Sequence, residues 1–330
     1  MKKILNRLFE HEKLTRDEAR EVLSKIAAND YNDSQVAAFI TVYLMRTVSK
    51  DELSGFRDAL LDLCLKVDMN GIESIDLCGT GGDGKNTFNV STLSSFVVAG
   101  AGYKVTKHGN YGVSSVCGSS NVLEAVGYNF TNNIDQLKAQ LDKTNIAFFH
   151  APLFHPAMKS VAPVRRNLGV KTFFNMLGPI VNPVRPTHQI SGVFSLKLLR
   201  LYQFILQEAN VHFKVLHALD GYDEVSLTGD FKVASNSGEE VLSPENLALQ
   251  CVKPEAIFGG DTIKEAVDLF KTIISGNGTY EQNAVVAANA GLAIHTFNPD
   301  SNIEDCVLLA KESLLNGKAH KTFKELLANS

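Results

Sequence analysis

The sequence predicts an α/β protein in which a small all-helical domain precedes a larger domain with a central, mostly parallel sheet flanked by helices. Two observations carry this prediction. Apolar residues recur at helical spacing through the first 70 residues, and from Gly71 the chain changes to short β-branched runs separated by glycine loops and helices. Strands that alternate with helices are typical of a parallel sheet.

The helical part is marked by its apolar faces and by one capping box. Ile4, Leu5, Leu8 and Phe9 share one face, and Thr15 followed by Glu18 predicts a helix start. A third helix is expected after Asn32 and Asp33, and a fourth over residues 51–65. We expect this domain to cover residues 1–70, with a contribution from about 165–182 where prolines interrupt the chain.

The larger domain is expected over residues 71–164 and 183–330. Helices are predicted over 91–101, 120–126, 196–208 and 262–274. The predicted strands are 72–78, 103–106, 146–149, 189–193 and 213–219.

Composition limits the class of partner. The 330 residues carry a formal charge of −4, which gives no electrostatic reason to bind nucleic acid or an acidic membrane surface. Five dispersed cysteines without a CxxC spacing favour a reducing compartment. No run approaches the ~20 apolar residues of a membrane span, and the charged N-terminus does not resemble a signal peptide, so we expect a cytoplasmic protein.

A glycine-rich loop follows the first predicted strand. The segment from Asp76 to Lys85 contains four glycines, whose backbone N–H groups can face phosphate oxygens. The loop satisfies G-x-G-x-x-G, but the acidic residue expected about 20 positions later in a dinucleotide site is missing. It also resembles a nucleotide P-loop, except that Asn86 replaces the magnesium-binding Ser or Thr. A plain turn is the competing interpretation.

The residues after this loop form a window without acids. Between Gly84 and Leu123 there is no Asp or Glu, although the whole chain has 36 in 330 residues. The window includes the predicted helix start Asn89-Val90-Ser91-Thr92, which could bind a phosphate or could simply cap the helix. It also includes Lys107-His108-Gly109-Asn110 at a strand end, followed by Ser114, Ser115 and Ser119. Its basic residues are Lys85, Lys104, Lys107 and His108, which suits a pocket for several phosphates.

Two adjacent carboxylates, Asp223 and Glu224, follow the strand predicted over 213–219. Magnesium prefers a few carboxylate oxygens together with phosphate and water, so this pair is a candidate magnesium site. A solvated acidic loop is the alternative for such a pair in isolation.

Taken together, these segments resemble the anthranilate phosphoribosyltransferases. The order and spacing of the motifs fit that family across nearly the whole chain, with a fold like that of nucleoside phosphorylases. The resemblance rests on residues 79–83, 89–92, 107–110, 164–169, 174–179 with 182–183, and 223–224.

The resemblance implies a role for each matching position. Phosphoribosyl pyrophosphate would be bound by Gly79, Gly82, Asp83, Thr87, Asn89, Val90, Ser91, Thr92, Lys107, His108, Gly109, Asn110, Ser115 and Ser119. Anthranilate would meet Gly79, Asn110 and Arg165, and magnesium would meet Ser91, Asp223 and Glu224. His108, Asn110 and Arg165 are the candidate catalytic residues.

The same resemblance implies a transferase of tryptophan biosynthesis that uses two magnesium ions per subunit and forms a homodimer through the helical domain. One departure stands out, because Tyr111 occupies the position where the family commonly has arginine. The alternatives are a pyrimidine nucleoside phosphorylase-like enzyme and a noncatalytic relative that binds nucleic acid. The chain's mild acidity argues against the second.

Overall fold

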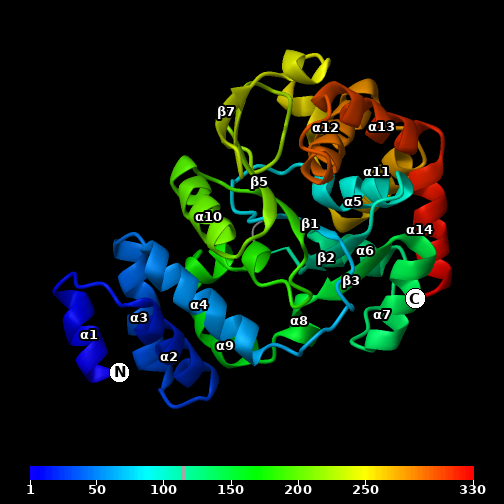
Figure 1. The fold of residues 1–330 in the computed structure, drawn as a ribbon. Helices are drawn as coiled ribbons and strands as arrows, with labels where there is room; N and C mark the ends of the chain where they lie inside the picture. The colour runs from blue at the N-terminus through cyan, green and yellow to red at the C-terminus, as the bar shows by residue number, and fades with distance from the viewer. Residues whose placement is uncertain (113–115) are drawn as a thin grey trace. The chain divides into compact units, whose positions relative to one another are not determined.

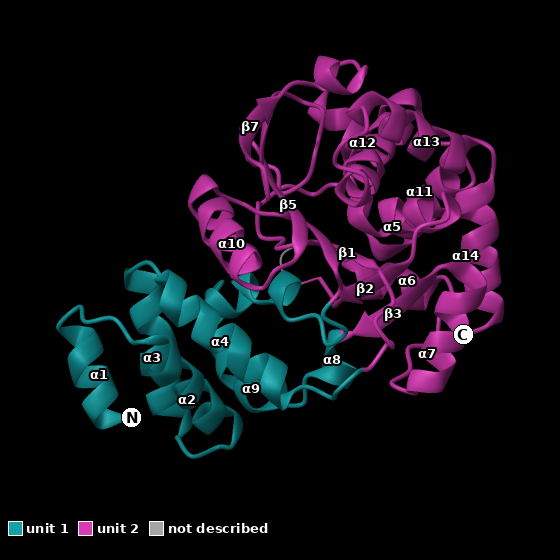
Figure 2. Ribbon diagram, in the orientation of Figure 1, with its two compact units in different colours: residues 1–67, 151–185 teal, residues 68–150, 186–330 magenta. Residues whose placement is uncertain are grey.

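A computed structural model describes residues 1–112 and 116–330 of the chain. The chain divides into two compact units, shown in two colours in Figure 2. The first contains residues 1–67 and 151–185, and the second contains residues 68–150 and 186–330. The segment that returns to the helical unit is thus longer than the 165–182 expected from the sequence.

The first unit is helical throughout (Figure 1). Thr15, Asn32 and Ser49 each form a capping box at a helix start, and the box at Thr15 confirms the sequence prediction. Its core is aromatic, since Phe56 stacks on Phe173 with ring centroids 4.5 Å apart. The helices are α1 (Lys2–Phe9), α2 (Arg16–Ala27), α3 (Asp33–Met45), α4 (Lys50–Leu63), α8 (Ala151–Phe154) and α9 (Met158–Leu168), with the short 3-10 turns Phe173–Met176 and Gly178–Ile180.

The second unit is built on a seven-stranded sheet of order β3-β2-β1-β4-β5-β6-β7. The first five strands are parallel to their neighbours, and β6 and β7 are added antiparallel. The strands are β1 (Ile75–Gly79), β2 (Val105–Gly109), β3 (Ile146–His150), β4 (His188–Gly192), β5 (His212–Ala218), β6 (Phe231–Ser235) and β7 (Gly238–Leu242). All five predicted strands are confirmed within three residues at each end. β6 and β7 were not expected from the sequence; β7 is an exposed edge strand without an apolar face and so gives little strand signal.

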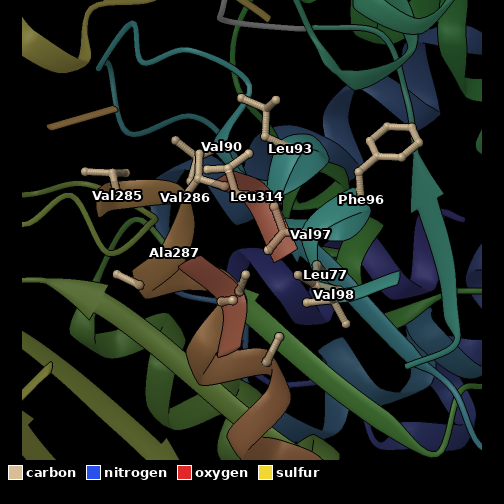
Figure 3. Packing of buried hydrophobic residues seen from close by; sticks show 14 of the residues in the cluster. Leu77, Val90, Leu93, Phe96, Val97, Val98, Val285, Val286, Ala287 and Leu314 are labelled. Carbon is tan, nitrogen blue, oxygen red and sulfur yellow. The ribbon is translucent and has the colours of Figure 1, made fainter. Parts of the chain in front are cut away.

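Helices pack the sheet into one large core. In Figure 3, Leu93 and Val97 of α5 and Val286 of α12 belong to the same buried cluster as Leu77 of β1 and Leu314 of α13. α10 packs against β5 and β6, and α7 packs against β3. The helices of this unit are α5 (Val90–Gly100), α6 (Ser119–Ala125), α7 (Ile134–Thr144), α10 (Leu196–Glu208), α11 (Ile263–Ile274), α12 (Tyr280–Phe297), α13 (Ile303–Leu315) and α14 (Lys318–Ala328), with the 3-10 turns Pro244–Leu247 and Pro254–Ile257.

The strand order places a switch point at β1 and β4. The chain runs outward from β1 through β2 to β3 and then returns to β4 on the other side of β1. Ligands of open α/β sheets bind outside the carboxyl ends of strands at such a point. Gly79 and Gly192 end the two strands and are register partners there.

No helix in the described part of the chain is long and apolar enough to span a membrane.

Candidate active site

The glycine loop after β1 is tied to the carboxylate pair. The backbone N–H of Gly81 donates to Oδ2 of Asp223 at 2.6 Å, and the backbone N–H of Asp223 lies 3.4 Å from Oδ2 of Asp83. The loop also needs glycine for its shape, because Gly81, Gly82 and Gly84 all have positive φ. Residues about 140 positions apart thus meet at the end of β1.

Two strand-end glycines make room for Asp223. A Cβ at Gly79 would lie 2.7 Å from Oδ2 of Asp223, and a Cβ at Gly192 would lie 1.5 Å from its carbonyl oxygen. The second contact is with backbone and cannot be relieved by rotating a side chain. Gly192 therefore sets the position of Asp223, and the sequence analysis did not identify it.

The start of α5 faces the same carboxylates. Thr87 Oγ1 donates to Oε2 of Glu224 at 3.2 Å, and the backbone of Ser91 also hydrogen-bonds Glu224. The Asn89 side chain does not cap the helix and donates instead to the carbonyl of Cys117 at 2.9 Å. Val90 and Thr92 are buried. Asn89 thus provides no side-chain cap for α5, whose first turn is contacted instead by Glu224, and a helix start of this kind can bind phosphate.

Lys107 carries a buried positive charge beside this helix start. Its side chain is 1 % exposed, and Nζ hydrogen-bonds the carbonyl of Leu77 and lies 3.4 Å from Oγ of Ser91. The neighbouring His108 is also buried, and its backbone N–H donates to Oδ1 of Asp76 at 3.1 Å. Both residues are on β2, the strand next to β1.

A pocket brings five of these groups together, whereas other candidate phosphate-binding residues, among them Asp83, Asn89 and Lys107, do not line it. It is lined by residues from the ends of β1 and β4, from α5, from α12 and from the carboxylate pair. Its lining residues are Leu77, Cys78, Gly79, Ser91, Ser94, Ile190, Gly192, Leu216, Asp223, Glu224 and Asn289. Gly79, Ser91, Asp223 and Glu224, which the sequence analysis selected from distant segments, are therefore neighbours.

Burial makes the carboxylates hard to ionise. Desolvation, followed by the charge of Asp83, raises the pKa of Asp223 to about 7. Desolvation, followed by the charge of Asp223, raises the pKa of Glu224 well above its usual value. The described residues contain no cluster of three or more His, Cys, Asp or Glu side chains suited to a metal. The donor set fits magnesium, which takes one or two carboxylates and completes its shell with phosphate and water.

The loop after β2 holds Asn110 at the surface. The Asn110 carbonyl accepts hydrogen bonds from Oγ of Ser119 at 3.2 Å and from the backbone of Ser120 at 3.1 Å. A Cβ at Gly109 would lie 2.7 Å from Oγ of Ser119, so glycine permits this close approach. Ser114 and Ser115, also noted in the sequence, lie outside the described residues.

Tyr111 is held in place by a glutamate and a histidine. Its hydroxyl donates to Oε1 of Glu124 at 2.6 Å, and its ring meets His150 edge-on at 5.0 Å. The position where the family commonly has a cation is thus occupied by a neutral ring that is bonded to a carboxylate.

Arg165 belongs to the helical unit and lies near the end of α9. Its guanidinium carbon is 5.2 Å from the ring centroid of Phe174, and burial lowers its pKa. The adjacent Arg166 is exposed. Of the two arginines, Arg165 is therefore the one held in a fixed place.

The structure removes one residue from the candidate site and adds another. Lys104 precedes β2 at the opposite end from the pocket and forms an ion pair with Asp142 at 3.2 Å, so it is not part of the phosphate region suggested by the acid-free window.

Asn289 of α12 was not expected from the sequence. It hydrogen-bonds both backbone groups of Val225 at 3.1 and 2.9 Å and so fixes the residue after Glu224. Its only signal in the sequence is a polar residue within the apolar run 284–294.

Comparison with known proteins gives matches to the same family over nearly the whole chain. Residues 72–320 match the a/b domain model of a glycosyl transferase family, and residues 2–64 match the helical bundle domain model of that family. The anthranilate phosphoribosyltransferase of Flavobacterium psychrophilum is 54% identical over 326 residues, which is 99% of this chain and 98% of that protein.

Solved structures agree with this match. The anthranilate phosphoribosyltransferase of Thermus thermophilus superposes with a TM-score of 0.92 at 31% identity, covering 98% of each chain. The Saccharomyces cerevisiae enzyme in complex with PRPP and Mg superposes with a TM-score of 0.90 at 24% identity, covering 98% of this chain and 96% of that chain.

Proposed function

This chain belongs to the anthranilate phosphoribosyltransferase family, and from that membership we propose how its own residues carry out the reaction. The enzyme is a pentosyltransferase of tryptophan biosynthesis. It transfers the phosphoribosyl group of phosphoribosyl pyrophosphate to the amine of anthranilate and releases pyrophosphate.

We propose that the glycine loop and the start of α5 bind the two phosphate ends of phosphoribosyl pyrophosphate. The loop 79–83, with Thr87, would meet the diphosphate. Residues 89–92 and Lys107 would meet the ribose phosphate, together with residues 108–110, Ser115 and Ser119. The observation that carries this proposal is the hydrogen bond between Gly81 and Asp223, because it joins the candidate phosphate loop to the candidate metal ligands.

Asp223, Glu224 and the hydroxyl of Ser91 are our proposed magnesium ligands, with two ions per subunit. Asp223 is buried and Glu224 half-buried, both line the pocket, and neither forms an ion pair in the described part of the chain, so a bound divalent cation would favour their charged forms. Magnesium would neutralise the negative charge of the diphosphate as it leaves.

For the acceptor, we propose Arg165 as the partner of the anthranilate carboxylate. A guanidinium offers two parallel donors to a carboxylate, and Phe174 holds this one in place. Asn110 and Gly79 are the other proposed contacts of anthranilate.

The protein would contribute mainly by positioning its substrates and stabilising charge. As the C1–O bond of the ribose breaks, positive charge develops on the ring, and the anthranilate nitrogen forms the new bond to C1 from the opposite face. The aromatic amine loses its extra proton readily after attack, so a strong base is not required. His108 is our candidate acceptor for that proton.

We further propose a cytoplasmic homodimer that associates through the helical unit. Large apolar side chains are exposed there, with Phe9 of α1 at 58% and Met45 of α3 at 87%. All five cysteines are free, as in a reducing compartment. A size measurement that gives a monomer at micromolar concentration would refute the dimer.

The central test of the site is the loss of anthranilate fluorescence when phosphoribosyl pyrophosphate and magnesium are added. The double variant Asp223→Asn, Glu224→Gln should remove magnesium-supported turnover, whereas Arg165→Ala should mainly weaken use of anthranilate. Turnover of the double variant at the wild-type rate would exclude the carboxylates as metal ligands. Phosphorolysis of thymidine or uridine by the wild-type protein would instead favour the nucleoside phosphorylase alternative.

A further inference from the structure

Lys85 stands at the end of the glycine loop and is attached to the carboxylate cluster through its backbone. Its N–H donates to Oδ1 of Asp83 at 3.0 Å, and the other oxygen of that carboxylate faces the backbone N–H of Asp223 at 3.4 Å. Any motion of the Lys85 side chain therefore starts from a fixed point beside the proposed diphosphate site.

The ammonium of Lys85 rests on an aromatic ring. Nζ lies 4.5 Å from the ring centroid of Tyr222, and Cε passes along Gly221, 3.7 Å from the place that a Cβ would occupy. Tyr222 is buried and directly precedes Asp223 and Glu224. The ring thus holds a positive charge on the residue that directly precedes the proposed magnesium ligands in the chain.

Lys85 is not neutralised by a carboxylate. It forms no ion pair and no side-chain hydrogen bond with the rest of the described chain, although Asp83 and Asp220 both lie close enough to raise the pKa of Tyr222. Lys107, the other cation of this region, is by contrast fully buried and hydrogen-bonded. Lys85 is half-buried and keeps a flexible four-carbon stem, so it can change partner at low cost.

We propose that Lys85 binds the diphosphate. Its ammonium group lies on the Tyr222 ring in the free enzyme and moves to hydrogen-bond a diphosphate oxygen when the substrate binds. A charge-assisted hydrogen bond to phosphate is stronger than a cation–π contact at a partly exposed site, so the ligand would win the exchange. The proposal rests on the function proposed above and adds a residue to the diphosphate end of that site.

The test compares Lys85→Met, which keeps the stem and removes the charge, with Lys85→Arg, which keeps the charge. Calorimetry would measure binding of pyrophosphate with magnesium and, separately, of ribose 5-phosphate, which lacks the diphosphate. Lys104→Met is the matched control, because Lys104 comes from the same acid-free window but pairs with Asp142 at the other end of β2.

We expect Lys85→Met to weaken pyrophosphate binding about tenfold and to raise KM for phosphoribosyl pyrophosphate by a similar factor. Binding of ribose 5-phosphate and KM for anthranilate should not change, and Lys85→Arg should restore most of the loss. Unchanged pyrophosphate binding by Lys85→Met would overturn the proposal, as would an equal loss for both ligands, since that would indicate a distorted loop. If the proposed function itself is wrong, the wild-type protein will leave anthranilate fluorescence unchanged when phosphoribosyl pyrophosphate and magnesium are added.

Discussion

Replacing Gly192 by alanine tests whether the position of Asp223 controls the chemistry. The added Cβ would lie 1.5 Å from the carbonyl oxygen of Asp223 and 2.6 Å from its carbonyl carbon, whereas real Cβ contacts essentially never fall below 3.0 Å. The backbone of Asp223 must therefore retreat by roughly 1.5 Å, and a displacement of about 1 Å at a reacting group costs on the order of 100-fold in rate. We expect kcat/KM of Gly192→Ala to fall by about that factor.

The assay is the loss of anthranilate fluorescence, repeated over a range of magnesium concentrations, with circular dichroism to check the fold. Gly229→Ala is the matched control in the same unit, because a Cβ at Gly229 would meet nothing within 4 Å. The kcat/KM of Gly79→Ala should fall between those of the two variants, since its Cβ would clash only with a side-chain oxygen, Oδ2 of Asp223 at 2.7 Å, which can shift more easily than backbone. A folded Gly192→Ala enzyme with wild-type kcat/KM would refute the reasoning.

Three further predictions concern other parts of the chain. Phe174→Leu should raise KM for anthranilate several-fold, because the ring that orients Arg165 is lost. KM for phosphoribosyl pyrophosphate should not change. Steady-state kinetics with each substrate varied in turn would measure both values. Glu52→Gln should lower the free energy of unfolding by about 3 kcal/mol in urea titrations, because Glu52 is fully buried and accepts hydrogen bonds from a guanidinium, a tyrosine hydroxyl and two backbone N–H groups. Burial and, to a smaller extent, the neighbouring histidine lower the pKa of His188 to about 4. As the pH drops from 6.5 to 4, the unfolded state therefore takes up a proton before the folded state does. The free energy of unfolding should fall by at most about 3 kcal/mol over this range. His188→Gln should flatten that part of the stability profile, and an unchanged slope would contradict the assignment.

The parts of the site that are contiguous in sequence could be predicted from it. A glycine loop after a strand, a polar helix start and a lysine at the next strand end each have a local signature, and Gly79, Ser91 and Lys107 were found in this way. Their positions follow from the rule that parallel strands end at one edge of a sheet. Five strands were accessible for the same reason, because each depends on a local change of pattern.

What the sequence could not supply were contacts between distant segments. Gly192 and Asn289 carry no motif, and their importance depends on the backbone that folding brings against them, at Asp223 and at Val225. Lys104 shows the opposite error, because charge counted along the chain ignores which end of a strand a residue occupies. Local patterns therefore identify candidate groups, whereas packing determines which of them share a site.

Charge separation within the larger unit is the feature that links its fold to its chemistry. Folding brings the carboxylates of Asp223 and Glu224 into a pocket with Ser91, whose hydroxyl lies 3.4 Å from the cation Lys107, yet in the described part of the chain neither carboxylate pairs with a cation. Lys107 bonds a carbonyl and a hydroxyl, and Lys85 lies on a ring. Ionising a buried carboxyl group that has no cationic partner is costly, so an arrangement of this kind is expected where a ligand supplies the partners. A diphosphate with magnesium carries both signs of charge, and it could therefore satisfy the lysines and the carboxylates at the same time.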